Sequence, residues 1–458
     1  MAIPFHPIVN LPNLRSNWKT FFCIFTVFGL GMIRVSALTL DDAVKGALAN
    51  NLDLRAAYFE VEKARGRLLQ AGLWPNPRVE IAATTDRAFN NEGQGFNSAG
   101  FSQPFPIAGR LRFAKQVGLV DVAQAIAEIR NRERLLIGET QREFLTVLVL
   151  DQQIATRGDF LKINREFVQV VEKRLEKAEV SQADVTLASV EAQRLELEIE
   201  TLQVSRAASE LALKQRLGLP PDAPLTLAGD VMTLANRFSP EKYSDKIIPN
   251  RPDLRLTELG IDRAQAEIRL ARAEAWGDWD VGFDFETDNA VDEPGGLNRD
   301  SFFGVKVAIP FPFWNRNQGR VQEQQAASAQ SKGEVDALRL TIRTQIATAL
   351  IRARKLREVV GSYQDRLLPA MTKTTDLLKN GYASGLTDAT QVIQGQQQRA
   401  LLLTSYLDVT NDYIQALVDL DTAAGASPFL KKEYLEIPDG RVRSGKTTAP
   451  SAQPNPRK

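Results

Sequence analysis

Gln103-Pro104-Phe105-Pro106 closes a strand-like segment, and the next proline after it is Pro220. Ile309-Pro310-Phe311-Pro312 repeats this arrangement later in the chain, and the next proline there is Pro369. Proline costs about 3 kcal/mol inside a helix, so proline-free stretches of this length permit long helices. Ala, Leu, Glu, Gln, Lys and Arg fill both stretches. The two motifs therefore predict two junctions at which strands give way to long helical arms.

Apolar residues recur at heptad spacing along both arms and along the segments that follow them. The four runs are Val122, Ile126, Ile129, Leu136, Val147, Leu150 and Ile154; Leu187, Val190, Leu197, Val204 and Leu211; Leu338, Ile342, Ala349, Leu356, Val359 and Tyr363; and Ile393, Ala400, Leu403, Leu407, Ile414 and Leu417. A repeat of 3.5 residues held this long is typical of coiled-coil packing. A helix over residues 109–178 would be roughly 105 Å long, and one over 315–380 roughly 100 Å, which indicates an elongated molecule.

Turn-forming residues fold each arm back on itself. The first turn is expected near residues 178–183, and the second, with two glycines, at 380–385. Each returning helix covers only about half of its outgoing arm, so the other half needs a different partner. We expect helices over residues 40–72 and 251–276 to supply it.

Four strand-like segments interrupt the helices in two pairs. They cover residues 79–84, 100–105, 280–286 and 303–309. The second pair alternates apolar and polar residues, and this period of two gives each strand two unlike faces. The connecting loops, at about 88–98 and 288–300, are rich in Asn, Gly, Asp and Pro. With its flanks each strand is about 9–11 residues long, the length of a transmembrane β-strand, whereas an isolated hairpin would be only marginally stable in water.

The order of these elements occurs twice in the chain. Residues 51–55 (Asn-Leu-Asp-Leu-Arg) and 251–255 (Arg-Pro-Asp-Leu-Arg) each open a helix, and the junction motifs and the turns recur at a similar offset. We infer an internal duplication. The predicted parts are a first repeat at 38–219, a link at 220–250, a second repeat at 251–425, and a largely disordered tail at 426–458.

Four strands per chain are too few to close a membrane barrel. Lipid does not tolerate open sheet edges, and the smallest membrane barrels have about eight strands. A dimer would supply eight strands, a trimer twelve and a tetramer sixteen. Since the helical arms continue from the strands, several copies would form a pipe with a barrel at one end.

The first 37 residues have the features of an export signal. Arg15 and Lys19 precede an apolar run at residues 21–33, and Val35-Ser36-Ala37 supplies a small-x-small cleavage pattern. The apolar run is shorter than the ~20 residues that a spanning helix needs. We expect cleavage before Leu38.

The composition argues against several classes of function. The 57 Lys+Arg and 56 Asp+Glu residues nearly cancel, which leaves no basic field to bind nucleic acid. The only histidine is His6 and the only cysteine is Cys23, and both lie in the predicted signal. The mature chain would then have no disulfide, no thiolate catalysis, no Cys/His metal site and no Ser-His-Asp triad. We expect neither an enzyme nor a bound cofactor.

Motifs in a defined order resemble those of the TolC-type outer-membrane efflux family over residues 38–425. They are Thr39-Leu40-Asp41-Asp42-Ala43 with Ala47, Asn50-Asn51 and Leu54; Ala71-Gly72-Leu73-Trp74-Pro75-Asn76-Pro77; Ser102-Gln103-Pro104-Phe105-Pro106; Leu217-Gly218-Leu219-Pro220; Arg251-Pro252-Asp253-Leu254; and Gly381-Tyr382-x-x-Gly385. Each motif is weak alone, and their combination is specific. Residues 105–112, Phe-Pro-Ile-Ala-Gly-Arg-Leu-Arg, resemble the CzcC-like heavy-metal branch.

The resemblance implies a mixed, mainly α fold. Each chain would contribute to a long coiled-coil α-helical barrel and give four strands to a trimeric, twelve-stranded transmembrane β-barrel. The homotrimer would lie in the outer membrane of a Gram-negative-type cell, with a long periplasmic part. It would be a passive exit duct that docks with a periplasmic adaptor (a membrane fusion protein) and an inner-membrane pump of the RND type.

The cargo implied by the resemblance is heavy-metal cations. Multidrug efflux and type I secretion remain alternative roles for such a channel, and a periplasmic coiled-coil adaptor is the alternative of another class. After the predicted signal, Met232 and Met371 are the only methionines, so no soft-metal relay is expected in the channel itself.

The resemblance also implies sites at the two turns. The pore or gate candidates are Asp184, Asp388, Gln391 and Gln394, and the adaptor-contact candidates are Ala178, Ser181, Gly381, Tyr382, Gly385 and Leu386. Asp184 occupies the family's acidic position. Where the family's namesake has two aspartates, this chain has glutamines, and Asp388 is the nearest acid. Because Asp is also a favoured helix cap, capping is the alternative role for Asp184 and Asp388.

Three tryptophans flank the predicted strands. Trp74, Trp276 and Trp314 lie where an aromatic girdle would meet the lipid interface. Packing in a core near the neck of the barrel is the alternative.

Overall fold

The computed structural model describes most of the chain. The described residues are 37–88, 93–238, 251–292, 296–425 and 429. Residues 1–36 of the predicted signal peptide, residues 239–250 of the link and all of the predicted tail except Phe429 lie outside the described residues.

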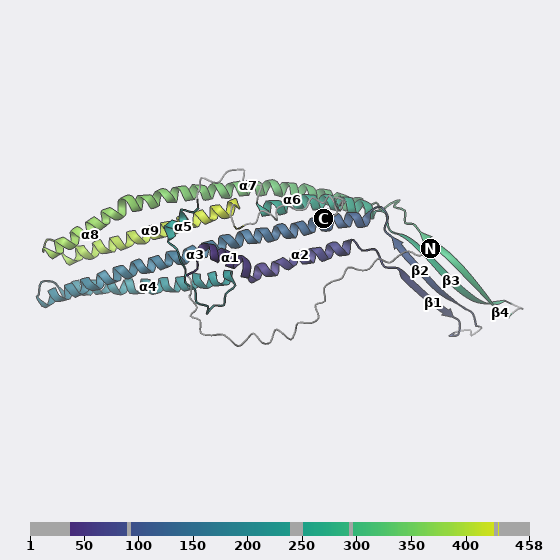
Figure 1. The fold of residues 1–458 in the computed structure, drawn as a ribbon, viewed down its shortest axis with the longest axis horizontal. Helices are drawn as coiled ribbons and strands as arrows, with labels where there is room; N and C mark the ends of the chain where they lie inside the picture. Colours follow the sequence, from purple (N-terminus) through teal and green to yellow (C-terminus); the bar gives the residue numbers. More distant parts are fainter. Residues whose placement is uncertain (1–36, 89–92, 239–250, 293–295, 426–428, 430–458) are drawn as a thin grey trace, which may run out of the picture.

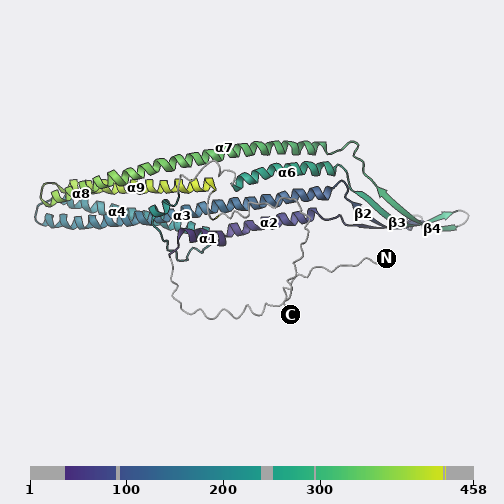
Figure 2. The same ribbon diagram turned by 45° about the horizontal axis from the view of Figure 1, so that its top comes forward.

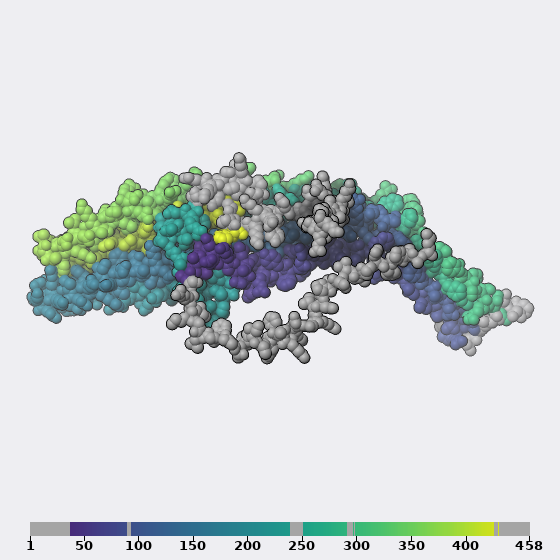
Figure 3. Space-filling model, viewed as in Figure 1, coloured from purple at the N-terminus to yellow at the C-terminus, as the bar shows by residue number. Residues whose placement is uncertain are grey.

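A long helical body leads into a β-sheet at one end, and the sheet is set at an angle to the body (Figures 1 and 3). The first half of the chain contains α1 (Leu40–Asn50), α2 (Leu52–Ala71), β1 (Arg78–Thr85), β2 (Gly95–Phe105), α3 (Arg110–Glu176), α4 (Gln182–Leu217) and α5 (Val231–Ala235). The second half contains α6 (Pro252–Glu274), β3 (Trp279–Asp292), β4 (Gly296–Ala308), α7 (Gln318–Ser362), a π-helical turn η3 (Tyr363–Leu367), α8 (Leu368–Ala383) and α9 (Ala389–Ala424).

The first long arm is confirmed and the second is interrupted. Helix α3 runs without a break for 67 residues, about 100 Å at 1.5 Å per residue. The second arm is divided into α7, η3 and α8, where one helix was expected. Pro369 lies at the start of α8, and because proline has no N–H it cannot make the regular α-helical bond.

The helix expected over residues 40–72 is two helices that meet at Asn51. The backbone of Asn51 leaves the helical region, with φ −58° and ψ 124°, and its side-chain oxygen accepts a 2.8 Å bond from the amide of Leu54. The side-chain amide of Asn51 donates to the carbonyl of Arg216, near the end of α4, at 3.1 Å. Asn51 therefore ends one helix, begins the next and links both to α4.

The long helices lie beside the partners that were expected. Near the sheet, α2 packs against α3 and α6 against α7; farther from it, α4 packs against α3 and α9 against α8. Helix α3 also contacts α6 and α9, which joins the two halves of the chain. In both views α2, α3, α6 and α7 follow one another across the body, so α2 and α7 are its outer helices there (Figures 1 and 2).

The four strands form one antiparallel sheet in the order β1-β2-β3-β4. Both predicted pairs are present, and β2 also pairs with β3. The strands are longer than expected: Gly95, Asp292 and Gly296 lie inside the segments predicted as loops, yet Gly95 pairs with Thr85 and Asp292 pairs with Gly296. Strand propensity depends strongly on context, and cross-strand pairing outweighs the Asn, Gly and Asp content here.

The sheet has one strongly apolar face. Val79, Phe101, Phe283 and Val305 lie opposite one another in successive strands, and Ile81, Ala99, Phe285 and Phe303 form the next row on the same side. The large side chains of both rows are exposed in the single chain. The row between them, Glu80, Gly100, Asp284 and Gly304, lies on the opposite face.

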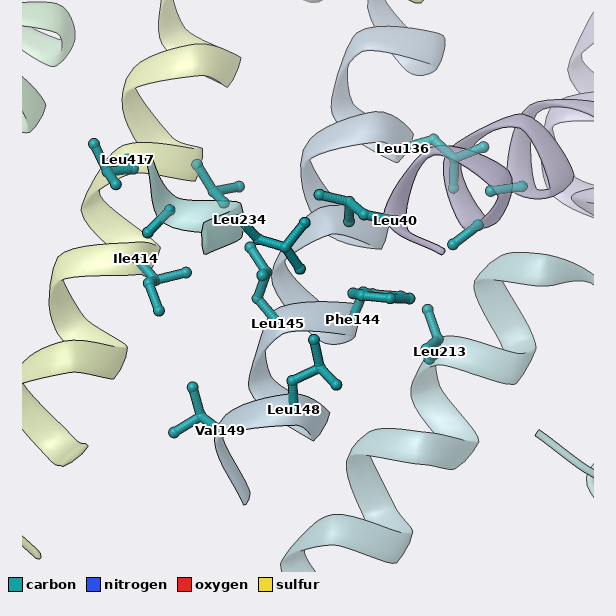
Figure 4. Close-up of a cluster of buried hydrophobic side chains, with 14 of the residues drawn as sticks. Leu40, Leu136, Phe144, Leu145, Leu148, Val149, Leu213, Leu234, Ile414 and Leu417 are labelled. Carbon is teal, nitrogen blue, oxygen red and sulfur yellow. The ribbon is translucent and has the colours of Figure 1, made fainter. Parts of the chain in front are cut away.

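The main hydrophobic core lies midway along the body, where α1, α3, α4, α5 and α9 meet (Figure 4). Phe144 and Leu145 of α3 are fully buried, as are Leu213 of α4 and Ile414 of α9. Residues 38 and 227 form a parallel β-bridge beside this core. The core therefore joins the start of the first repeat to the ends of both returning helices.

Two buried arginines bind the end of α9. Nη1 of Arg134 donates to the carbonyl of Thr422 at 2.7 Å, and Nη1 of Arg251 to that of Ala423 at 2.7 Å. Nε of Arg251 also donates to Asp253 at 3.0 Å. Burial and the neighbouring Arg251 lower the pKa of Arg134 to about 10. The Arg-Pro-Asp-Leu motif thus attaches the start of the second repeat to its end.

The negative charge of the Asp253 carboxylate compensates the positive charges of Arg134 and Arg251. Burial would raise its pKa, but hydrogen bonds from Arg251 and the charges of Arg251 and Arg134 hold the pKa of Asp253 below its usual value. Its contribution to stability is therefore present above the unfolded-state pKa of about 3.9, and is lost as the pH falls through the lower folded-state pKa.

We expect Asp253→Ala to lower the free energy of unfolding by about 3 kcal/mol at neutral pH, because it leaves two buried guanidinium groups uncompensated. Chemical denaturation followed by circular dichroism measures the change. Asp222→Ala, at an exposed loop position, is the control and should change stability by less than about 0.5 kcal/mol. Equal denaturation midpoints for the two variants would contradict this role of Asp253.

Candidate functional site at the helical tips

The two helical hairpins end side by side, at the end of the body away from the sheet (Figures 1 and 2). The first tip joins α3 to α4 and the second joins α8 to α9. A small apolar cluster packs them together with side chains from both hairpins: Phe167, Val171, Ala188, Tyr382, Ala389, Val392 and Ile393. The structure thus brings all the predicted gate and adaptor-contact residues to one end of the molecule.

Both tips have the same backbone turn. The residue at the turn has a positive φ, 57° at Ala178 and 74° at Gly385. The amide of the next residue donates back into the last helical turn. In the first tip Glu179 donates to the carbonyl of Arg174 at 2.9 Å, and in the second tip Leu386 donates to the carbonyl of Gly381 at 2.8 Å. This is the Schellman arrangement that ends many helices. Ala178 adopts it at a cost of roughly 1–2 kcal/mol that glycine does not incur.

Asp184 takes part in a capping box at the start of α4. Ser181 is the N-cap, and its hydroxyl accepts a 3.3 Å bond from the amide of Asp184. One carboxylate oxygen of Asp184 accepts in return from the amide of Ser181 at 2.9 Å and from its hydroxyl at 2.7 Å. The alternative prediction that Asp184 is itself the N-cap is therefore wrong: Ser181 is the N-cap, and Asp184 completes the capping box from the third helical position of α4.

Asp388 is the N-cap of α9. Its Oδ1 accepts a 2.8 Å hydrogen bond from the amide of Gln391. Its side chain is exposed, as are those of Gln391 and Gln394 in the first turns of α9. Both tips therefore hold a carboxylate at a helix N-terminus, where the helix dipole favours negative charge.

Tyr382 connects the two hairpins. It is only 6% exposed, and its ring centroid lies 5.5 Å from that of Phe167 on α3. The guanidinium carbon of Arg174 lies 4.0 Å from the Tyr382 ring centroid, and Nη2 of Arg174 donates to the Tyr382 carbonyl at 3.1 Å. Sequence reasoning missed Arg174 and Phe167, since both lie on the other hairpin, about 200 residues away along the chain.

The other tip residues differ in accessibility. Leu386 is 83% exposed, and Ala178, Ser181 and Gly385 are also exposed, whereas Tyr382 is buried. A Cβ at Gly381 would lie 2.8 Å from the hydroxyl oxygen of Thr387, so the turn leaves little room for a side chain there.

A second polar link joins the hairpins above the tips. Glu191 of α4 is buried, and its Oε2 accepts a 2.8 Å bond from Gln397 of α9 and a 3.0 Å bond from Nε of Arg194. Hydrogen bonding to Glu191 raises the pKa of Arg194. Sequence reasoning did not single out these residues, because charged residues on long helices are usually solvated.

The three predicted interface tryptophans are exposed beside the sheet. Trp74 is 59%, Trp276 43% and Trp314 88% exposed in the single chain. Trp74 makes an edge contact with Phe105, the last residue of β2, with ring centroids 5.9 Å apart. Within this chain, none of the three is part of a buried core.

The part of the chain that the structure describes contains no group of three or more His, Cys, Asp and Glu side chains that could hold a metal ion. None of its helices is both long and apolar enough to cross a membrane.

Comparison with known proteins supplies the family. Residues 43–219 and 244–426 match the family described as Outer membrane efflux protein. The chain belongs to this family. The match covers both predicted repeats and confirms the resemblance seen in the motifs.

Curated relatives are similar over most of their length. The chain is 24% identical over 393 residues to the cobalt-zinc-cadmium resistance protein CzcC of Cupriavidus metallidurans, covering 85% of this chain and 90% of that protein. It is 22% identical to the pyoverdine export outer membrane protein OpmQ of Pseudomonas putida, with 82% and 85% covered. The similarity to CzcC agrees with the branch suggested by residues 105–112.

Solved structures share the fold. A crystal structure of CusC matches with a TM-score of 0.71 at 20% identity, covering 84% of this chain and 91% of that one. The outer membrane protein VceC of Vibrio cholerae matches with a TM-score of 0.64 at 16% identity, with 84% and 96% covered. These likenesses support the mainly helical fold with its four-stranded sheet.

Proposed function

We propose that this outer membrane efflux protein is one subunit of a homotrimeric exit duct. Three copies would close a twelve-stranded transmembrane barrel in the outer membrane of a Gram-negative-type cell and a helical tunnel through its periplasm. The duct would be passive and would receive cargo from an inner-membrane RND-type pump through a periplasmic adaptor. Family membership and the fold shared with CusC support this proposal.

The main support for the proposal comes from the two edge strands of the sheet, β1 and β4. Among the residues that the structure describes, strands β1 and β4 each pair with only one other strand, so each leaves a row of backbone N–H and C=O groups without strand partners there. In lipid such groups must be paired, which only a closed barrel achieves. Pairing β4 of one copy with β1 of the next satisfies them, and the apolar face of the sheet then meets lipid.

The helical body has matching apolar edges. Three of the four heptad runs pack largely within the chain, but the run on α4 does not: Val190, Leu197, Val204 and Leu211 are 48–71% exposed. On the other side of the body, Leu340 and Ile351 of α7 and Leu377 of α8 are exposed too. A heptad stripe without a partner favours packing against another helix. We assign the two edges to contact between neighbouring copies.

We also propose that the chain arose by an internal duplication, with one repeat at 38–219 and the other at 251–425. The same sequence of helix, strand pair, long helix, turn and returning helix occurs at 38–219 and at 251–425. The link at 220–250 includes α5 and the segment that bridges to residue 38 beside the main core. We propose that these residues form a belt around the middle of the tunnel.

The tips would form the periplasmic entrance. Asp184, Asp388, Gln391 and Gln394 are assigned to its lumen. The assigned adaptor contacts are Ala178, Ser181, Gly381, Tyr382, Gly385 and Leu386, with Tyr382 supporting the turn from beneath because its ring is buried. At the other end of the tunnel, Trp74, Trp276 and Trp314 are assigned to the membrane interface.

Heavy-metal cations are the proposed cargo, on the strength of the similarity to CzcC. Multidrug efflux is the second candidate, because the chain is also 24% identical over 404 residues to the outer membrane protein OprJ of Pseudomonas aeruginosa. Type I secretion and a periplasmic adaptor role have less support, since neither has a counterpart among these relatives.

The first test is oligomeric state. Purified protein in detergent should be a trimer by light scattering. Leu197→Arg should break it into smaller species, because a charge placed in the α4 stripe is costly to bury between copies. Gln203→Arg, at an exposed α4 position on a different face from the apolar run, is the control and should stay trimeric. A wild-type monomer would contradict the exit-duct proposal.

The second test concerns charge at the entrance. A ring of carboxylates in a narrow neck favours cations and binds divalent ions. Asp184→Ala should therefore weaken cation selectivity in planar bilayers and raise the divalent concentration needed for block, and adding Asp388→Ala should deepen both effects. Ser181→Ala is the control, because it removes the capping hydroxyl and keeps the charge. If the double variant conducts like wild type, both aspartates act only as caps.

The third test concerns cargo. Deleting the gene from its host should raise sensitivity to cobalt, zinc and cadmium, and the intact gene should restore growth. Growth in dyes and detergents, measured in parallel, tests the multidrug alternative. A deletion strain sensitive to dyes and unaffected by the three metals would favour that alternative.

A further inference from the structure

The π-helical turn η3 carries an arginine whose charge its own chain leaves uncompensated. Nη2 of Arg366 donates to the hydroxyl of Ser362 at 3.0 Å. No carboxylate in the described part of the chain forms an ion pair with Arg366, and its side chain is exposed. A guanidinium group has five donors in a planar fork that fits a carboxylate. Arg366 is therefore free to bind an acidic group from outside the chain.

The π-helical turn places Arg366 on the side of the arm that faces away from the chain. Gln364, in the same turn, donates from its side-chain amide to the hydroxyl of Tyr406 at 2.7 Å, so the side of η3 that carries Gln364 faces α9. Arg366 follows two residues later, about half a turn around the helix. It therefore belongs to the exposed outer edge formed by α7 and α8.

Glu200 is the corresponding free carboxylate on the α4 edge. It is exposed, and the residues that the structure describes give it no ion-pair partner. Two residues earlier, Glu198 accepts a 3.2 Å bond from Nε of Arg157, so the side of α4 that carries Glu200 faces away from α3. Glu200 lies between Leu197 and Val204, which are 64% and 71% exposed members of the apolar stripe. The two outer edges of the body thus carry free charges of opposite sign.

Glu200 and Arg366 lie at the same level along the body. Hydrogen bonds at this level connect the helices in turn: α4 to α3 through Glu198 and Arg157, α3 to α9 through Asp408 and Gln153 at 2.9 Å, and α9 to η3 through Tyr406 and Gln364. On each shared helix the successive bonds are within about one turn of each other. Figure 1 shows α4 and the arm of α7 and α8 on opposite sides of this half of the body.

A pair of exposed apolar residues agrees with this level. Val190 of α4 is 55% exposed and Leu377 of α8 is 62% exposed, and both lie on the tip side of the charged residues. At 1.5 Å per residue, Val190 is about 15 Å from Glu200 along α4, and Leu377 is about 16 Å from Arg366 along the other arm. The two edges therefore match in spacing as well as in charge.

We propose that Glu200 of one copy forms an ion pair with Arg366 of the next copy around the ring. Rotation about a ring axis that runs along the body brings each level of one copy against the same level of its neighbour. The occupant of each charged edge is then a second copy of this chain. This inference rests on the proposed homotrimer, in which the pair would occur three times.

The pair would also select how copies meet. Two α4 edges brought together would oppose two carboxylates, and two η3 edges would oppose two guanidinium groups, so like edges repel. Contact of unlike edges is the head-to-tail arrangement that closes a ring. Because Leu197 and Val204 flank Glu200, water and salt would screen the pair less than an exposed surface pair.

Cross-linking tests the contact directly. Glu200→Cys and Arg366→Cys are introduced together in purified protein with Cys23 changed to Ser, and the protein is oxidised. Denaturing electrophoresis without reductant should show covalently linked trimers. Glu200→Cys with Arg343→Cys is the control, because Arg343 is exposed on α7 but roughly 35 Å from Arg366 along the arm. This control should remain mostly unlinked.

Charge reversal tests the energetic role. Glu200→Arg or Arg366→Glu alone should increase the rate at which dodecyl sulfate dissociates the trimer about tenfold, because like charges then meet at every interface. The double exchange of Glu200→Arg with Arg366→Glu should restore the wild-type rate. Glu200→Arg combined with Arg343→Glu should dissociate as fast as Glu200→Arg alone, since the second change lies at another level.

The outcomes separate this ion pair from the proposed duct. A wild-type trimer that gives no link between Glu200→Cys and Arg366→Cys would overturn the pair and leave the duct standing. So would a double exchange that dissociates as fast as the single reversals. A wild-type monomer would contradict the duct and, with it, the pair.

Discussion

The unpaired backbone of the two edge strands is the constraint on which the rest of the molecule depends. Strands β1 and β4 expose N–H and C=O groups beside an apolar face, a combination that is unstable in water and not tolerated in lipid unless the edges meet. In the proposed duct, closing the sheet around three copies would also fix where the attached helices lie. A neighbouring copy would then cover the exposed heptad stripe of α4.

Much of this architecture could be predicted because its signals are local. Proline spacing located the arms, and α3 begins and ends within two residues of the expected bounds. The predictions that were wrong rested on local sequence signals that contacts between distant parts of the chain override. The Asn- and Asp-rich ends of β1 to β4 resembled loops but are paired across the sheet, and Asn51 divides a helix because it can bond to α4.

The tips show the same division between local and distant information. Their turns were visible in the sequence, and so was the N-cap role of Asp388, since a cap depends on residues three positions apart. The N-cap of α4 is Ser181, and Asp184 contributes to the cap from the third helical position. The surroundings of Tyr382 were not, because Phe167 and Arg174 reach it from the other hairpin. A single sequence gives the chemistry of each turn but not the contacts between turns.

The two hairpins follow the same plan and differ in what stabilises them. The first turn places Ala178 in a conformation that glycine would adopt more easily, a strain that the continuous, well-buried α3 can hold in place. The second turn has Gly385 at that position, and its arm is broken by η3 and Pro369. Strain is retained where the surrounding structure is rigid, and relaxed geometry accompanies the more weakly packed arm. The same fold plan thus yields one hairpin with a continuous outgoing helix and one whose outgoing helix is interrupted.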